Sequence, residues 1–192
     1  MHDKSEFESM PTRVALHPFL AGMSRFHLAL LADCAINAHF REGQIILREK
    51  EIANRFYLIE SGKVALEAKA SSGEPVVIET IGSGQLLGWS WMFPPYLWHF
   101  TARALVPTTA IFFYGSILRE YCERDHSLGF ELFKRMSAVM MHGLQSARHK
   151  ILALHSDDVS TLARNSAYQP TTPASPVDVA FAVDLDLREG AD

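Results

Sequence analysis

Residues 56–64 read FYLIESGKV, and this stretch decides the fold. Its first four residues, Phe56 to Ile59, are aromatic, branched or apolar, a run typical of a buried strand. Ser61-Gly62-Lys63 then has the composition of a tight turn, and a second apolar run, VALEAK, follows directly at residues 64–69. The stretch therefore predicts two short strands joined by a tight turn.

The same alternation of short apolar runs and turn residues extends from Ile36 to Tyr114. Glycine, serine and proline separate the runs. The further runs are AHF at 38–40, QIIL at 44–47, VVIETI at 76–81, QLL at 85–87, HFTARALV at 99–106 and TAIFFY at 109–114. Many short strands at this spacing predict an antiparallel double-stranded jelly roll.

Helical patterns flank the strands on both sides. Residues 17–34 predict a helix after Pro18, because apolar side chains recur there every three or four residues. The members of this stripe are Phe19, Met23, Phe26, Leu30 and Cys34. Downstream, Ser116 is a candidate N-cap for a short helix, and a long helix is predicted over residues 126–155. The fold class is therefore α+β, mainly β, with a jelly roll between an N-terminal helix and a long C-terminal helix.

The apolar residues of the long helix fit a heptad repeat, the spacing of a contact between two helices. The two alternating sets are Phe130, Ser137, Leu144 and Ile151, and Phe133, Met140, Ala147 and Leu154. We expect the first half to pack on the jelly roll of its own chain. The second half lies furthest from any predicted strand and would be marginal as an isolated helix. It is therefore predicted to form a homodimer through Met140, Leu144, Ala147, Ile151 and Leu154.

Charge is unevenly distributed along the 192 residues. The whole chain holds 18 basic and 22 acidic side chains, but residues 156–192 hold two basic and seven acidic ones, together with three prolines. Such a segment buries too little apolar surface to offset its ordering entropy, which predicts a flexible acidic tail. The predicted organisation is an extension over 1–15, one domain over 16–155 and the tail over 156–192. An apolar alternation at 177–187 leaves open that this segment forms one strand or docks on a partner.

Several classes of protein are disfavoured by the sequence. No signal peptide or membrane-spanning run is visible, which predicts a cytoplasmic protein with no membrane contact. Cys34 and Cys122 stand in no metal or redox spacing, and the nine histidines form no ligand set. No nucleophile motif or phosphate-binding loop is present. We therefore expect no enzyme, no catalytic residues and no metal site, although a haem, which needs only one axial His or Cys, remains open.

A set of glycine and apolar positions carries a family resemblance. The set comprises Phe40-x-x-Gly43-x-x-Ile46, Phe56-Tyr57-Leu58-Ile59-x-x-Gly62-x-Val64, Gly84-x-x-x-Gly88 and Ala102-Arg103-Ala104. Over residues 17–155 the chain resembles the cyclic nucleotide-binding domain family, represented by the sensor half of catabolite-activator-type regulators. The resemblance implies a jelly-roll sensor. One family glycine falls near Lys50, so the turn there is expected to differ.

The resemblance also implies a phosphate-binding cassette beginning at Gly84. In the family, a glutamate there binds the ribose hydroxyl, and an arginine together with the N–H groups of a short helix binds the cyclic phosphate. Gly88 matches, but the glutamate position is Trp89, and the arginine position is Trp98 or His99, depending on where the match is anchored. Loss of both charged groups should weaken cyclic nucleotide binding by roughly a hundredfold or more.

Aromatic residues replace the charged groups of this cassette, and all three tryptophans of the chain lie in it. Such rings can stack a planar ligand, and a protonated His99 could add a positive charge. The predicted ligand, nucleotide-like or another planar anion, would contact Gly88, Trp89, Ser90, Trp91, Trp98, His99, Phe100 and Thr101. The alternative is that the rings fill the pocket themselves and leave it inert.

Regulators of this family normally continue into a helix-turn-helix domain. Here the roughly 40 residues after Ile151 are acidic and interrupted by proline. We therefore expect no recognition helix and no direct DNA binding. The leading hypothesis is a stand-alone, dimeric regulatory sensor with an altered cassette. It would bind a ligand other than cyclic AMP, or bind cyclic AMP far more weakly, and would signal to a separate effector protein. The alternative is a ligand-free dimeric interaction module with an aromatic-plugged pocket.

Overall fold

The structure, a computed structural model, describes the backbone of residues 8–165 and the side chains of residues 8–153. Within the described residues, the chain divides into two units, residues 8–145 and 146–165. The predicted strand at 177–187 and most of the predicted tail lie outside the described residues.

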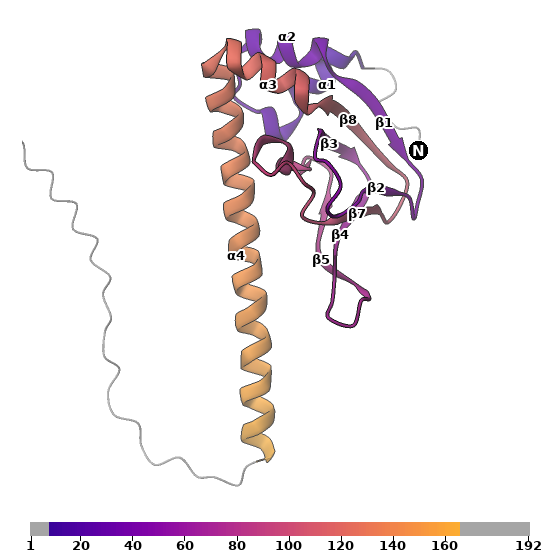
Figure 1. The fold of residues 1–192 in the computed structure, drawn as a ribbon, viewed down its shortest axis with the longest axis vertical. Helices are drawn as coiled ribbons and strands as arrows, with labels where there is room; N and C mark the ends of the chain where they lie inside the picture. Colours follow the sequence, from indigo (N-terminus) through magenta and orange to yellow (C-terminus); the bar gives the residue numbers. More distant parts are fainter. Residues whose placement is uncertain (1–7, 166–192) are drawn as a thin grey trace, which may run out of the picture. The chain divides into compact units, whose positions relative to one another are not determined.

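Two four-stranded antiparallel sheets form the jelly roll of the first unit (Figure 1). The first sheet has the order β1 (Ile36–Phe40), β8 (Thr108–Tyr114), β3 (Arg55–Ser61) and β6 (Leu86–Leu87). The second has the order β2 (Ile45–Leu47), β7 (Thr101–Ala104), β4 (Lys63–Lys69) and β5 (Pro75–Gly82). The predicted fold class, a mainly β jelly roll with flanking helices, is confirmed.

The predicted turn at Gly62 carries the chain from one sheet to the other. β3 pairs with β8 and β6, whereas β4 pairs with β5 and β7. Gly62 has a φ of +100°, and a Cβ atom there would lie 2.3 Å from the Thr108 hydroxyl oxygen and 2.7 Å from the Thr108 Cα. Only glycine therefore fits this crossing point.

The alternation of β3 divides the apolar residues between two cores. Phe56 and Leu58 belong to a core shared with the helices, here called the helical core. Tyr57 and Ile59 point to the opposite face and belong to a core shared with the second sheet, here called the inner core. The inner core therefore lies between the two sheets, in the interior of the jelly roll.

The N-terminal region differs from the single helix predicted over residues 17–34. It forms α1 (Met10–Leu16), a 3₁₀ turn η2 (Pro18–Leu20) and α2 (Arg25–Asp33). Gly22, with a φ of +76°, breaks the helix, and the Ser24 hydroxyl restarts it by accepting a hydrogen bond from the His27 N–H. Of the predicted apolar stripe, Met23 is buried and Phe19, Leu30 and Cys34 pack against the helical core, but the prediction was wrong for Phe26, which is exposed.

Three further helical segments follow: a 3₁₀ helix η3 (Trp89–Met92), α3 (Gly115–Arg124) and α4 (His126–Asn165). Ser116 is not the N-cap of α3, because Tyr114 takes that position. α4 is capped instead by Asp125, whose carboxylate accepts hydrogen bonds from the Ser127 and Leu128 N–H groups at 3.0 and 3.2 Å. The helix continues beyond residue 155, where the long helix was predicted to end.

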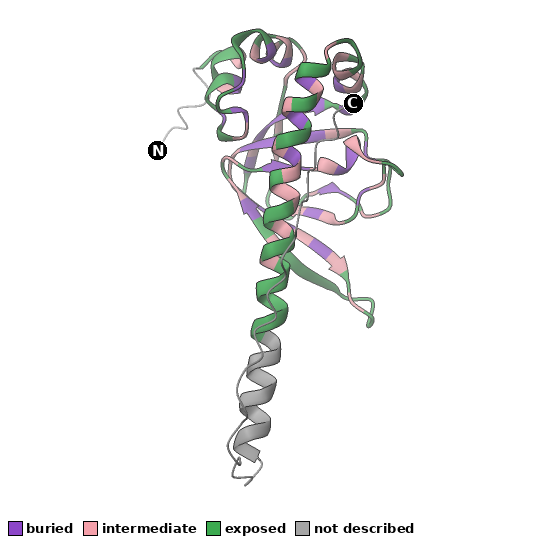
Figure 2. Ribbon diagram, turned by 90° about the vertical axis from the view of Figure 1, so that its left-hand side faces the viewer, coloured by how far each residue is buried: buried purple, intermediate pink, exposed green. Residues whose placement is uncertain are grey.

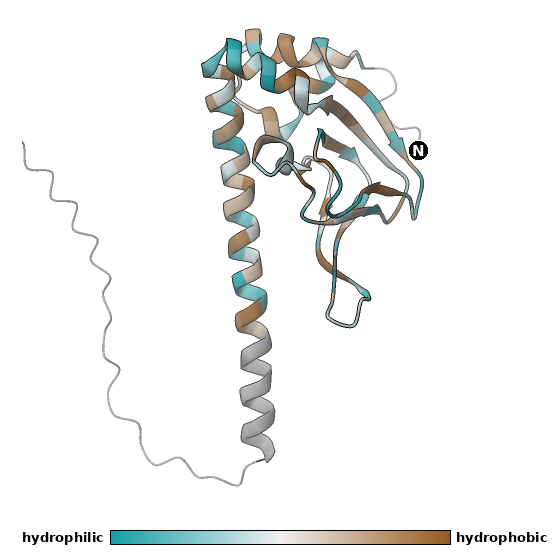
Figure 3. Cartoon of the chain, in the orientation of Figure 1, coloured by the Kyte–Doolittle hydropathy of each residue, from teal (hydrophilic) through white to brown (hydrophobic). Residues whose placement is uncertain are grey.

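The first half of α4 packs on its own domain, as expected, but through a different stripe. Leu128, Leu132 and Met136 are buried in the helical core. Phe130 and Phe133, which the heptad pattern placed in the seam, are exposed. Figure 2 shows how exposed residues come to dominate along α4, and Figure 3 shows that several of these are hydrophobic.

Candidate functional site

The candidate site begins at Gly88, between β6 and η3. Gly88 has a φ of +94°, which disfavours any other residue. A Cβ atom at this position would lie 3.1 Å from the Trp98 ring and 3.3 Å from the Arg55 carbonyl oxygen. The backbone of the predicted cassette therefore passes directly over one tryptophan and over the first residue of β3.

Trp98 fills part of the inner core. Its side chain is only 3% exposed, and it packs with apolar residues from both sheets. The backbone around it is fixed by two hydrogen bonds of 2.9 Å: the Trp98 N–H donates to the Glu51 carbonyl, and the Trp98 carbonyl accepts from the Lys50 N–H. Lys50 adopts a φ of +68°, at the turn where the family glycine was missing from the sequence.

Trp91 lies on the other side of the first sheet. It is fully buried in the helical core and stacks on Phe56, with ring centroids 5.6 Å apart and an interplanar angle of 13°. Its indole nitrogen has no hydrogen-bond partner among the described residues. Trp91 and Trp98 are therefore held in different cores.

Trp89, Ser90 and His99 come together at one place. The rings of Trp89 and His99 stack with centroids 5.2 Å apart and an interplanar angle of 18°. The Ser90 hydroxyl lies within hydrogen-bond distance of His99 Nδ1, at 2.9 Å. Ser90 is buried, Trp89 is half-buried and His99 is exposed. The remaining candidates lie alongside: Phe100 is half-buried, and the Thr101 hydroxyl accepts a hydrogen bond from the Glu49 N–H at 3.2 Å.

The arginine of the Ala102-Arg103-Ala104 motif has a structural role. Its guanidinium donates to both carboxylate oxygens of Glu67, at 2.9 and 3.2 Å, and to the Gly43 carbonyl at 3.2 Å. The hydrogen bond to Glu67 raises the pKa of Arg103. Its charge is therefore already compensated, and the residue joins β7, β4 and the turn before β2.

A second arginine reaches the cassette from α3. Arg119 donates a hydrogen bond of 2.7 Å to the Trp91 carbonyl, and its guanidinium lies 5.1 Å from the centre of the Tyr96 ring. These contacts fix the end of η3 and the following loop against α3. Sequence reasoning missed Arg119, because no motif marks a residue that approaches a loop from a separate helix.

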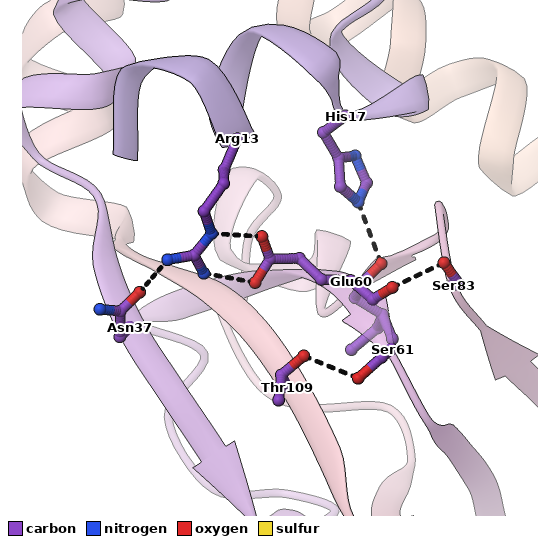
Figure 4. Close-up of polar contacts among 8 residues, drawn as sticks. Arg13, His17, Asn37, Glu60, Ser61, Ser83 and Thr109 are labelled. Atoms are coloured by element: carbon purple, nitrogen blue, oxygen red, sulfur yellow. Dashed lines mark hydrogen bonds and ion pairs between the residues drawn. The ribbon is translucent and has the colours of Figure 1, made fainter. Parts of the chain in front are cut away.

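A separate cavity of about 220 Å³ lies where α1 meets the first sheet. Figure 4 shows Arg13 bound to Glu60 by two hydrogen bonds, of 2.7 and 2.5 Å, and to Asn37 by a third, of 2.6 Å. His17, whose pKa is lowered by burial, lies 3.1 Å from the Ile59 carbonyl oxygen. Because these polar groups satisfy one another, we assign them to the anchoring of α1 and η2 on β3.

No group of three or more potential metal-ligating side chains comes together within residues 8–153. Both cysteines are free, and burial raises the pKa of each thiol to about 11. In the part of the chain that the structure describes, no helix has the length and apolar character needed to cross a membrane.

Comparison with known proteins places this geometry in context. Residues 37–125 match the model of a family described as the cyclic nucleotide-binding domain. A protein from Geobacter metallireducens GS-15, described as cyclic nucleotide-binding, is 26% identical; the match covers 70% of this chain and 97% of that one, with a TM-score of 0.63. No curated protein sequence matches the chain.

Two further solved structures share the fold at lower identity. A cyclic nucleotide-binding domain from Methylobacillus flagellatus KT is 16% identical, with 80% of this chain and 96% of that chain covered and a TM-score of 0.67. The catabolite activator protein of Thermus thermophilus is 18% identical, with 72% and 63% covered and a TM-score of 0.59. At these identities the likeness concerns the fold alone.

Proposed function

Residues 37–125 of this chain belong to the cyclic nucleotide-binding domain family, and we propose that the protein is a regulatory sensor whose cassette has lost the family's grip on cyclic nucleotides. The observation that carries this proposal is the stack of Trp89 on His99. An indole and an imidazole meet where the resemblance implies a carboxylate and a guanidinium.

The loss of these two groups removes the main attractions for a cyclic nucleotide. A carboxylate accepts hydrogen bonds from the ribose, and a guanidinium fork binds the phosphate charge. Trp89 can do neither, and the Ser90 hydroxyl already lies against one of the two ring nitrogens of His99. Trp98, at the other candidate position for the arginine, is apolar and buried. The sensor is therefore proposed to bind a planar, anionic or nucleotide-like ligand rather than cyclic AMP.

We propose that the residues predicted from the sequence contact the ligand, but that they do so in different roles. Trp89 and His99 are accessible for stacking, and Ser90 supplies a hydroxyl beside them. Gly88, Phe100 and Thr101 form the adjoining backbone and wall. Trp91 is buried in the helical core and Trp98 in the inner core. A ligand-induced shift of the cassette would therefore move a side chain in each core.

We assign the output of the sensor to α4. The loop after η3 contacts α4 through Phe93 and Phe133, whose ring centroids lie 6.1 Å apart. Further along α4, Leu144 and Ile151 are 66% and 56% exposed and lie seven residues apart, the spacing of one face in a contact between two helices. The proposed assembly is a cytoplasmic homodimer through α4 that passes the signal to a separate effector protein.

Titration of a panel of planar anions and nucleotides tests the sensor proposal, with binding followed by calorimetry and tryptophan emission. Wild-type protein should bind at least one compound of the panel, and Trp89→Leu should weaken that binding at least tenfold. Because Trp89→Leu removes the stacking ring but keeps the Ser90 hydroxyl, the loss of affinity measures the contribution of stacking and not that of the hydrogen bond. A wild-type protein that binds no compound of the panel would refute the sensor role.

A second candidate function rests on Trp98. Its ring is almost completely buried in the interior of the jelly roll, which favours a pocket plugged by its own side chain. The protein would then be a ligand-free dimeric interaction module. In that case Trp98→Ala, which empties the space, should bind apolar planar compounds that wild-type protein rejects.

A further inference from the structure

The inner face of the first sheet carries an arginine that the cassette comparison does not include. Arg55 opens β3, and the alternation of the strand places it on the same face as Tyr57. The register pairs Arg55 with Tyr114 and Tyr57 with Phe112 across β8. Residues directly opposite in an antiparallel pair share a face, so these four side chains form one patch, here called the Arg55 face.

The rings of the Arg55 face run from the interior toward solvent. Tyr57 lies 5.4 Å from Phe112, and Phe112 lies 4.5 Å from Tyr114 in an edge-to-face contact, as measured between ring centroids. Tyr57 is buried in the inner core, Phe112 is half-buried and Tyr114 is 45% exposed. A planar molecule can therefore reach the rings of Tyr114 and Phe112 from solvent, with Tyr57 behind them in the inner core.

Among the described residues, the guanidinium of Arg55 forms no ion pair with a carboxylate. Arg13 and Arg103 pair with glutamates, whereas the buried Nε of Arg55 has no hydrogen-bond partner among the described residues. Burial raises the pKa of Tyr57, whereas the charge of Arg55 and a hydrogen bond from the Arg55 side chain lower it, so Arg55 already contacts one of the two phenols. A half-buried cation beside two phenols, with an unsatisfied N–H, is suited to an anion.

We propose that Arg55 and the phenols of Tyr57 and Tyr114 bind the carboxylate of a small planar aromatic acid, whose ring lies against Phe112 and Tyr114. One guanidinium balances one negative charge, which suits a carboxylate better than a doubly charged phosphate. The exposed ring of Tyr114 supplies a stacking surface. This inference rests on the proposed sensor function, because the same jelly roll would hold the ligand: the Arg55 carbonyl oxygen lies directly beneath Gly88 of the cassette.

Calorimetric titration with 2-naphthoate tests the Arg55 face, with the neutral 2-naphthamide as the matched compound. Wild-type protein should bind 2-naphthoate, and its affinity for 2-naphthamide should be at least tenfold lower. Arg55→Gln should weaken binding of 2-naphthoate at least tenfold, and Tyr114→Phe should weaken it severalfold. Arg48→Gln, which removes the same charge from an exposed position after β2, should bind like wild type. Thermal unfolding checks each variant, and Tyr114→Phe is the least disruptive because its ring is retained.

The outcomes separate this inference from the proposed function. If wild-type protein binds 2-naphthoate and Arg55→Gln binds it equally well, the assignment to Arg55 is wrong while the sensor function stands. The same holds if Trp89→Leu abolishes binding but Arg55→Gln does not. If wild-type protein rejects 2-naphthoate but binds a nucleotide of the panel, the ligand class is wrong and the sensor function again stands. Binding of no compound overturns both.

Discussion

The ring of Trp89 stacks on the ring of His99, with centroids 5.2 Å apart and planes inclined by 18°. This contact joins the start of η3 to the second residue before β7 and so connects the two ends of the cassette. In the related domains, the resemblance implies that a bound ligand bridges these positions through charged groups. Here two side chains bridge them directly, which changes both the stability of the loop and the chemistry of whatever binds there.

The first prediction concerns this stack. His99→Phe keeps an aromatic ring beside Trp89 but loses the contact with Ser90, whereas His99→Ala loses both. Aromatic pairs contribute about 0.5–1.5 kcal/mol beyond buried area, so His99→Ala should lower the free energy of unfolding by about 1 kcal/mol more than His99→Phe does. Urea denaturation measures the difference. Equal losses in the two variants would mean that the stack contributes nothing to stability.

The second prediction concerns the dimer. Leu144→Asp together with Ile151→Asp places two charges in the proposed seam and should give a monomer by light scattering. The matched control is Gln145→Asp with Leu152→Asp, which has the same spacing on α4 and also replaces an apolar side chain that is 56% exposed. This control should remain dimeric. If the first variant is still a dimer, the proposed dimer contact through Leu144 and Ile151 is wrong. Leu154, also predicted to contribute, lies outside the described side chains.

The third prediction concerns the turn that carries the chain between the sheets. Gly62→Ala should destabilise the domain by more than about 3 kcal/mol, because the new methyl group meets the backbone of Thr108 and the φ is positive. Gly73→Ala is the control: its φ is +85°, but nothing lies within 4 Å of the added atom. It should cost only about 1 kcal/mol in a denaturant titration. Similar costs at the two positions would show that close packing at Gly62 is unimportant.

The fourth prediction concerns acid stability. Hydrogen bonds, first from Ser127 and then from the Leu128 N–H, lower the pKa of Asp125 to about 2. Since the folded pKa lies below the unfolded value of about 3.9, the stabilisation is present above pH 4 and is lost as the pH falls toward 2. Asp125→Ala should therefore lower the melting temperature at pH 7, with the difference from wild type shrinking between about pH 4 and pH 2.

The exposed Asp33→Ala serves as the control for Asp125, because it carries the same charge change at the end of α2. Its melting temperature at pH 7 should differ little from that of wild type. An Asp125→Ala difference that stays constant down to pH 2 would contradict the capping role.

The strands could be predicted from sequence because each is a compact apolar run with its own turn residues. Which strands pair could not, because pairing depends on contacts between distant segments: FYLIE and VALEAK are adjacent in sequence yet lie in different sheets. The N-terminal helix failed for a local reason. Phe26 looked like a core residue by spacing, but Gly22 and Ser24 restart the helix with another face inward.

The sequence showed which residue types make up the candidate site, but not where their side chains lie. The clustering of tryptophans beside Gly88 predicted an altered cassette. The sequence could not show that Trp91 and Trp98 enter opposite cores, because a loop with two prolines has no period from which to read its faces. Arg55 was missed for a different reason. The strand alternation places it on the inner face with Tyr57, but its pairing with Tyr114 and its unsatisfied Nε are evident only from the structure.

The most direct test of the central claim is isothermal titration of the wild-type protein with cyclic AMP. Without the carboxylate and the guanidinium of the family cassette, we expect no saturable heat at ligand concentrations up to roughly 1 mM. A saturable isotherm with a Kd of about 1 μM would contradict the claim, because it would show that Trp89, Trp98 and His99 have not removed the family's grip on the nucleotide.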